Sequence, residues 1–471
     1  MNKYLIPILI ASSSLLIQNA NANVRLPAII GNHMVLQQNA DVKLWGWCDP
    51  FEKVKINPSW DTTTYNGKGT SDAKWEVKIK TPAAGGPYTI TISASNKIVI
   101  EDVLIGEVWD CSGQSNMEMS YSWGITQYKA DADSANNKSI RLFHIPRLSA
   151  AWPQDDTKGS WVVCNPDDMK QFSLAGYFFG KKLNNVLSVP VGLIEANWGG
   201  TPAEVWTPKD SILNNIVLHK AADNLKYSDY WPVKPSATFN AMIYPITNYA
   251  IAGVIWYQGE SNTNSASTYT QLFTTMINSW RTAWHIDLPF YYVQIAPFSG
   301  YDGISGALLK EAQTKTLSVP KTGMIIIDDK VTDLKDIHPK DKKDVGERLA
   351  DLVLSDVYGK TNFVHQYPMY KSMQVVKNKI QVTFSNADDG LVNKGDTVKG
   401  FYIAGTDKKF FPAMAKIKGN TVTVYNDNIK DPVAVRYDFT NVAIPTLFNK
   451  AGLPANLFRT DDWDDVKTTG N

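Results

Sequence analysis

The middle of the chain, from about residue 106 to 360, alternates short apolar runs with segments of helical length. This alternation limits the possible folds more than any other feature. Continuous apolar runs are typical of strands that are buried on both faces of a parallel sheet. The apolar runs are 103–109, 191–194, 251–257, 290–295 and 324–327, and the helical segments include 174–187, 269–284 and 341–357. The pattern predicts a doubly wound α/β domain with a parallel sheet.

The regions on both sides of this block have a different periodicity. Residues 42–47, 75–79 and 88–92 alternate apolar and polar side chains, and Gly, Pro, Asn and Asp occupy the breaks. The same pattern returns after about residue 365, in 379–384, 400–403, 420–425 and 432–437. A period of two between turn signals predicts antiparallel, sandwich-like β structure. We therefore expect a β domain at 23–105, an α/β domain at 106–362 and a C-terminal β-rich domain at 363–471.

The first 22 residues have the features of a secretory signal peptide. Lys3 supplies a positive start, residues 5–17 are apolar or small, and Ala20-Asn21-Ala22 is a small-residue cleavage site. The apolar run is shorter than a transmembrane helix requires. We expect cleavage before Asn23 and a secreted or periplasmic protein.

Composition excludes several classes of protein. The 471 residues include 47 Lys and Arg against 46 Asp and Glu, so a nucleic-acid carrier or a polybasic membrane binder is not expected. The 3 cysteines allow at most one disulfide and have no metal-ligand spacing. No histidine pair has the spacing of a metal site, and no glycine-rich phosphate loop occurs. We expect no cofactor and no bound metal.

Two polar motifs follow the first two of the predicted core strands. Ligands of open α/β sheets bind beyond the carboxyl ends of the strands. Residues 110–117 present Ser115, preceded by Gln114, at a strand-to-helix turn, where a serine can act as a nucleophile. Residues 197–202 contain Trp198 and the pair Gly199-Gly200, whose backbone N–H groups could form an oxyanion hole. Taken alone, each motif also fits an ordinary polar turn.

Two further motifs follow later strands. Residues 256–262 offer Gln258 and Asn262 as uncharged donors to an oxyanion, and Glu260 as a buried anchor or a second nucleophile. Residues 333–339 place Asp336 two positions before His338, which has the chemistry of a general base near neutral pH. Together the four motifs supply a nucleophile, oxyanion donors, a base and an orienting acid. This combination predicts an acyl-transfer site.

These motifs resemble those of the sialate O-acetylesterases, within the SGNH (GDSL-like) hydrolases. The similar stretches are 106–118, 197–206, 255–262, 336–339, 432–437 and 453–460. The resemblance implies an SGNH-type core and a serine esterase that removes acetyl groups from sugar hydroxyls. It also implies that Ser115 is the nucleophile, that His338 is the base and that Gly200 or Gly199 belongs to the oxyanion hole.

The chain departs from the pattern of the wider group at two places. The group's asparagine follows the third-motif glycine by two residues, where this chain has Ser261, so the amide donor could be Asn262 or Gln258. The group's aspartate precedes the histidine by three residues, where this chain has Lys335. Asp336 could therefore orient His338, or a backbone carbonyl could do so and leave a Ser-His dyad.

The sequence thus predicts a secreted carbohydrate O-acetylesterase, and the resemblance favours acetylated sialic acid as its substrate. Esters of xylan or another plant polysaccharide are the alternative within the same chemistry. A carbohydrate-binding protein with an inactive core and a glycoside hydrolase that uses Glu260 with Glu118 or Glu204 are further alternatives. The expected partner is an acetylated sugar, with no nucleic acid and no membrane insertion. The oligomeric state is left open.

Overall fold

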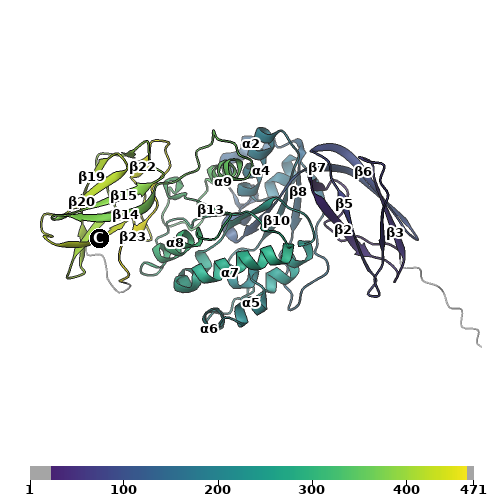
Figure 1. The fold of residues 1–471 in the computed structure, drawn as a ribbon, viewed down its shortest axis with the longest axis horizontal. Coiled ribbons are helices and arrows are strands. Elements are labelled where there is room, and N and C mark those ends of the chain that lie inside the picture. Colours follow the sequence, from purple (N-terminus) through teal and green to yellow (C-terminus); the bar gives the residue numbers. More distant parts are fainter. Residues whose placement is uncertain (1–22, 464–471) are drawn as a thin grey trace, which may run out of the picture.

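The computed structural model describes residues 23–463, and the predicted signal peptide lies outside this range. Three parts follow one another along the long axis of the molecule (Figure 1). The N-terminal strands lie at one end, the α/β core in the middle and a β-sandwich at the other end. The fold is therefore a mixed α/β structure with a parallel central sheet and additional antiparallel sheets, as the sequence predicts.

The central sheet has the strand order β13-β12-β11-β7-β10-β8-β9. All neighbours are parallel except β9, which is antiparallel to β8. The strands are β7 (Lys97–Gly113), β8 (Asn137–Ile145), β9 (Trp161–Cys164), β10 (Val191–Asn197), β11 (Gly253–Tyr257), β12 (Phe290–Val293) and β13 (Thr322–Ile325). The strands β10, β11 and β12 are buried throughout, which explains their continuous apolar sequences.

Helices cover both faces of this sheet (Figure 1). The helices α4 and α9 pack on each other on one face, and α7 and α8 do so on the other. The α-helices are α1 (Ser115–Glu118), α2 (Lys129–Asp133), α3 (Pro166–Gln171), α4 (Leu174–Leu187), α5 (Lys209–Leu213), α6 (Ile216–Asp223), α7 (Ala266–Trp284), α8 (Ser305–Thr316) and α9 (Lys342–Asp356). Short turns of 3-10 or π helix are η1 (Tyr121–Trp123), η2 (Thr126–Tyr128), η3 (Ala203–Trp206), η4 (Phe239–Ile243), η5 (Tyr244–Ile246), η6 (Glu260–Ser265) and η7 (Asp328–Lys330).

The N-terminal strands are joined to the core through β7. The first half of β7 pairs with β6, and its second half pairs with β10 and β11, so the domain boundary predicted at residue 105 falls inside one strand. The strands are β1 (Val35–Gln37), β2 (Asp41–Trp47), β3 (Lys53–Pro58), β4 (Tyr65–Lys68), β5 (Lys74–Lys80) and β6 (Gly85–Ser93). Their buried side chains belong to the same apolar cluster as the α/β core.

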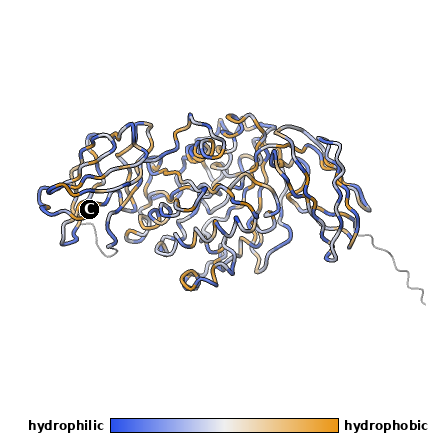
Figure 2. The backbone as a smooth tube through the Cα atoms, in the orientation of Figure 1, coloured by the Kyte–Doolittle hydropathy of each residue, from blue (hydrophilic) through white to orange (hydrophobic). Residues whose placement is uncertain are grey.

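The C-terminal part is built from two four-stranded sheets, ordered β14-β15-β20-β19 and β18-β17-β21-β23, and the pair β16-β22. Its strands are β14 (Met369–Val376), β15 (Lys379–Ser385), β16 (Leu391–Asn393), β17 (Phe401–Gly405), β18 (Phe410–Pro412), β19 (Met414–Lys418), β20 (Thr421–Tyr425), β21 (Pro432–Tyr437), β22 (Leu447–Asn449) and β23 (Phe458–Arg459). It has an apolar core of its own. The alternation of hydrophobic and hydrophilic residues that predicts its strands is visible along the tube in Figure 2.

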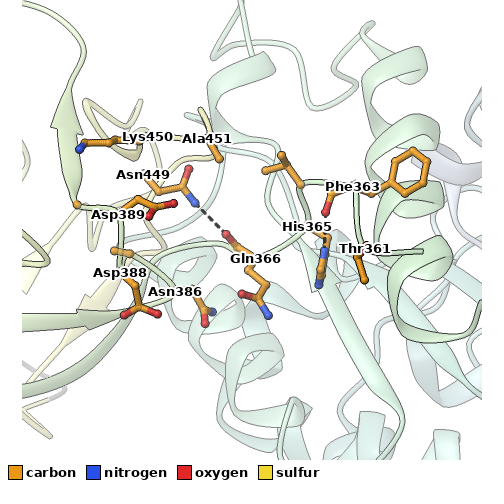
Figure 3. Close-up of a pocket in the computed structure, with 13 residues that line it drawn as sticks. Thr361, Phe363, His365, Gln366, Asn386, Asp388, Asp389, Asn449, Lys450 and Ala451 are labelled. Atoms are coloured by element: carbon orange, nitrogen blue, oxygen red, sulfur yellow. Dashed lines mark hydrogen bonds between the residues drawn. The ribbon is translucent and has the colours of Figure 1, made fainter. Parts of the chain in front are cut away.

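Polar contacts join this sandwich to the α/β core. Arg459 forms an ion pair with Glu311 of α8, with an Nε–Oε1 distance of 2.9 Å. The side chain of Asn441 accepts a hydrogen bond from Gly306 N and donates to the carbonyls of Tyr301 and Gly303. A further contact runs from Asn449 Nδ2 to the carbonyl of Gln366, in the segment after α9, and crosses the pocket shown in Figure 3.

Candidate active site

Three of the four polar motifs begin at one level of the central sheet. In the parallel register, Gly113 at the end of β7 lies opposite Asn197 of β10 and opposite Tyr257 of β11. A Cβ atom on Gly113 would come within 2.3 Å of the Tyr257 carbonyl oxygen, and its φ is +150°. Glycine is therefore required for the close approach of β7 to β11 just before Ser115. The register brings these motifs together as predicted.

Ser115 and His338 form a hydrogen-bonded pair. Ser115 is the first residue of the short helix α1, and His338 lies in the loop that precedes α9. The distance from Ser115 Oγ to His338 Nε2 is 3.0 Å. The ring of Trp123 contacts the His338 ring edge-on, at 6.1 Å between centroids. This arrangement of a hydroxyl beside an imidazole is the geometry that activates a serine nucleophile.

The surroundings of His338 lower the pKa of its imidazole. Burial lowers the pKa of His338, and the positive charge of Lys342 lowers it further, while Asp336 acts in the opposite direction. A lower pKa keeps the imidazole unprotonated to more acidic pH. The ring can then accept the proton of Ser115 at and below neutral pH.

Asp336 lies beside His338 but does not hydrogen-bond its ring. Asp336 Oδ1 is 3.8 Å from His338 Nδ1, which is beyond hydrogen-bond distance. The same oxygen accepts a hydrogen bond of 2.9 Å from the backbone N–H of His338. Asp336 is also 38% exposed, so its charge is partly screened by solvent. In this geometry Asp336 holds the loop and does not fix the tautomer of His338.

Two backbone N–H groups are available beside Ser115. The N–H groups of Ser115 and Gly200 donate to no acceptor within residues 23–463. Gly200 has a φ of +81°, and a Cβ atom there would collide with the Trp231 ring at 2.4 Å. Gly199, in contrast, donates its N–H to Glu118 Oε2 at 2.8 Å. Of the predicted glycine pair, the structure leaves Gly200 free to bind an oxyanion.

The amides of Asn262 and Gln258 have protein partners. Asn262 Nδ2 donates to Glu204 Oε2 at 2.9 Å, and Gln258 Nε2 donates to Asn262 Oδ1 at 2.8 Å. Both residues are fully buried. Tyr269 completes the cluster by donating to Gln258 Oε1. An oxyanion would have to displace these bonds, so both amides have the contacts of structural anchors.

The remaining predicted residues connect the motifs to one another. Gln114 Oε1 accepts from the N–H groups of Gly259 and Ser261, both at 3.4 Å. Glu260 accepts a hydrogen bond of 2.5 Å from Asn116 Nδ2. Trp198 is held by a bond from its Nε1 to the Tyr230 carbonyl, which fixes the loop on that side. The contacts of Gln114 and Glu260 tie the loops after β7 and β11 together, and the Trp198 bond anchors the loop after β10 to Tyr230.

Several residues at the site were not predicted as parts of an esterase site, although Glu118 was a candidate acid in the glycoside hydrolase alternative. Glu118 bridges Gly199 to Arg147, whose Nε donates to Glu118 Oε1 at 2.6 Å. Asn116 and Lys342 are buried and hydrogen-bonded to each other. Asn116 lies inside the first motif and Glu118 directly follows it, whereas Lys342 and Arg147 carry no local signal because their partners are far away in the chain.

The structure adds three general observations. Cys48, Cys111 and Cys164 are buried free thiols. Within residues 23–463, no group of three or more His, Cys, Asp or Glu side chains is arranged to hold a metal ion. The helices in the same range are all too short or too polar to cross a membrane.

Comparison with known proteins first defines the class of enzyme. The family model of carbohydrate esterases described as sialic acid-specific acetylesterases matches residues 106–355. The crystal structure of a carbohydrate acetylesterase from Xanthomonas citri superimposes with a TM-score of 0.85 at 34% identity, covering 94% of this chain and 100% of that one. The protein is therefore a carbohydrate esterase, as the sequence predicts.

The family follows from the same matches. Sialate O-acetylesterase of Homo sapiens is 28% identical, over 90% of this chain and 89% of that protein. Sialate O-acetylesterase of Mus musculus is 26% identical, over 90% and 91%. This chain belongs to the sialic acid-specific acetylesterase family of carbohydrate esterases. Membership of this family argues against the two alternatives of another class, an inactive carbohydrate-binding protein and a glycoside hydrolase.

Proposed function

We propose that this esterase removes acetyl groups from sugar hydroxyls through a covalent acetyl-enzyme on Ser115. The observation that carries the proposal is the 3.0 Å contact between Ser115 Oγ and His338 Nε2. His338 accepts the serine proton as Ser115 attacks the acetyl carbonyl. The N–H groups of Ser115 and Gly200 stabilise the negative oxygen that forms.

Protonated His338 then donates its proton to the departing sugar oxygen, which completes the first half of the reaction. In the second half His338 accepts a proton from a water molecule as the water attacks the acetyl-enzyme. It returns this proton to Ser115 Oγ as the ester bond breaks and acetate leaves. Ser115→Ala is expected to lower acetate release by several orders of magnitude, because triad nucleophiles contribute that much to the rate. A folded Ser115→Ala enzyme with near-normal turnover would contradict this assignment.

We propose acetylated sialic acid as the substrate, because the pocket beside Gly200 has a lining suited to an anionic sugar. The pocket has a volume of about 320 Å³ and is lined by Gly200, Ser261, Trp231 and Lys226, among others, with no acidic side chain. Lys226 forms no ion pair with any residue in 23–463. It can therefore pair with the carboxylate of a sialic acid, while Trp231 offers an apolar ring surface to the sugar.

A substrate comparison separates sialate esters from the neutral alternative. Acetate release is measured from O-acetylated sialic acid and from acetylated xylo-oligosaccharides, with wild type, Lys226→Met and Lys209→Met as a surface control. The proposal predicts that only Lys226→Met raises KM, and only for the sialate ester. Higher kcat/KM on the xylo-oligosaccharide, with no effect of Lys226→Met on either substrate, would favour a plant-polysaccharide esterase.

We also propose that the enzyme is exported and acts outside the cytoplasm. The support is the sequence of residues 1–22, with Lys3, an apolar run and the Ala20-Asn21-Ala22 site. Mass spectrometry of the protein recovered outside the cytoplasm should show a chain that starts at Asn23. Recovery of an exported chain that retains residues 1–22 would contradict cleavage.

A further inference from the structure

A buried amide connects the segment of the nucleophile to the segment of the base. Asn116 directly follows Ser115 and is fully buried. Its Nδ2 donates to the carbonyl of Ile337, the residue before His338, at 3.1 Å. The same Nδ2 donates to Glu260 at 2.5 Å. One side chain thus links the neighbours of both reacting residues to the loop after β11.

The other end of this amide is held by a buried lysine. Lys342 Nζ donates to Asn116 Oδ1 at 2.6 Å, and Lys342 is 0% exposed. The ammonium group also lies 5.0 Å from the centroid of the Tyr257 ring. Asn116 therefore receives a hydrogen bond from the Lys342 amine and gives one to the Glu260 carboxyl group. This polarised chain fixes the direction of the amide, because a flipped amide would lose both bonds.

Lys342 occupies a position that is unfavourable for a cation. It is the first residue of α9, where the helix dipole disfavours positive charge. Burial lowers the pKa of Lys342 to about 7, opposed by the charges of Glu260, Asp336 and Asp341. Burial raises the pKa of Glu260. A methionine would fill the same space without this desolvation cost, but it would leave Asn116 Oδ1 buried without its donor. What the lysine supplies at this position is the hydrogen bond that holds the Asn116 amide.

We propose that Lys342 is a positioning residue for the reaction: through Asn116 it fixes Ser115 relative to His338. The inference rests on the proposed roles of Ser115 and His338. Lys342 does not touch the reacting atoms. It acts by holding the Asn116 amide in the orientation that binds the Ile337 carbonyl, and by its charge.

The sign of the electrostatic effect is defined by the groups that surround His338. Burial and the charge of Lys342 lower the pKa of His338, and Asp336 raises it. Replacing Lys342 by a neutral residue therefore raises the pKa of His338. The acid limb of kcat/KM, which reports the pKa of the base in the free enzyme, should then move to higher pH. A lysine that only supports the fold would leave this limb in place.

The test compares Lys342→Met with Lys343→Met in the full chain. Lys343 is the next residue of α9, and its Nζ is paired with Asp131 at 3.4 Å, away from Asn116. For Lys342→Met we expect kcat on a small acetyl ester, per titrated active site, to fall about 100-fold, the scale of a small misplacement of reacting groups. KM should change little and the acid limb should move to higher pH. Lys343→Met should match wild type in both.

A second variant keeps the proposal testable if Lys342→Met does not fold. Asn116→Ala removes the amide but keeps the lysine charge, so kcat should fall while the acid limb stays near its wild-type position. Wild-type kcat or an unmoved acid limb in folded Lys342→Met, or wild-type kcat in folded Asn116→Ala, would overturn the proposal. Ser115→Ala is assayed beside them, because its turnover alone tests the proposed nucleophile.

Discussion

At the scale of single residues, the geometry around His338 favours a dyad over a triad. Asp336 is 3.8 Å from His338 Nδ1 and bonds the backbone N–H instead. The sequence could place Asp336 near His338, since side chains two apart in an extended segment point the same way. It could not predict that the Asp336 carboxylate would accept a hydrogen bond from the backbone N–H of His338, because this contact depends on the path of the loop.

Asp336→Asn is expected to reduce kcat by about tenfold or less, because the change removes only a nearby charge and one pKa unit corresponds to ~1.4 kcal/mol. An aspartate that orients the catalytic ring would cost on the order of 10⁴-fold when changed to asparagine. Steady-state kcat on an acetyl ester distinguishes the two. A loss near the larger value would restore Asp336 as the third member of a triad.

The pH dependence of kcat/KM should show the lowered pKa of His338. The base must be neutral, so activity is present above this pKa and is lost as the pH falls through it. Because burial and Lys342 lower the pKa, the acid limb should have its midpoint below the ~6.5 of an ordinary histidine. The profile is measured on a neutral ester at constant ionic strength. A midpoint above the ordinary value would contradict this prediction, because it would mean that the folded site raises the pKa of His338.

At the scale of elements, strands and helices with clear periodicity could be predicted closely. Residues 174–187 form α4 as predicted, and the Ser173 side chain caps it by accepting from Gly176 N. The strand β8 was not predicted, because Arg141 interrupts its apolar sequence. Arg141 is buried and forms an ion pair with Asp102 at 2.5 Å. A pairing partner in another strand has no signature in the local sequence.

The turn after β10 should tolerate no side chain at Gly200. An alanine there would collide with Trp231 and adopt a positive φ, a strain of about 1–2 kcal/mol before the collision is counted. Alanine keeps the backbone N–H, but the collision must shift the turn that carries it. If the Gly200 N–H binds the oxyanion, this displacement should lower kcat, by as much as the roughly 10²–10³-fold that loss of an oxyanion donor costs. Both kcat and Tm are measured.

Gly452→Ala is the matched control for this change. Gly452 has a φ of +91° and no atom within 4 Å of an added Cβ. Gly452→Ala should therefore be destabilised by a similar strain energy and keep the wild-type kcat. Equal kcat in Gly200→Ala and Gly452→Ala would exclude the Gly200 N–H as an oxyanion donor.

At the scale of the whole molecule, the three parts differ in their independence. The N-terminal strands share an apolar core with the α/β domain and continue into it through β7, whereas the C-terminal sandwich has its own core (Figure 1). Periodicity alone could divide the chain into three blocks. It could not show that one strand serves two of them, because the break in pattern at residue 105 marks a change of neighbours and not the end of a strand.

The central claim is that Ser115 attacks the acetyl group, and covalent labelling tests it most directly. A phosphonate ester that reacts with activated serines is incubated with the full-length enzyme, and the label is mapped by peptide mass spectrometry while activity is followed. We predict stoichiometric labelling at Ser115 that parallels the loss of acetate release, and much slower labelling of His338→Ala. Full activity in enzyme labelled at Ser115, or inactivation with the label on another residue, would contradict the account.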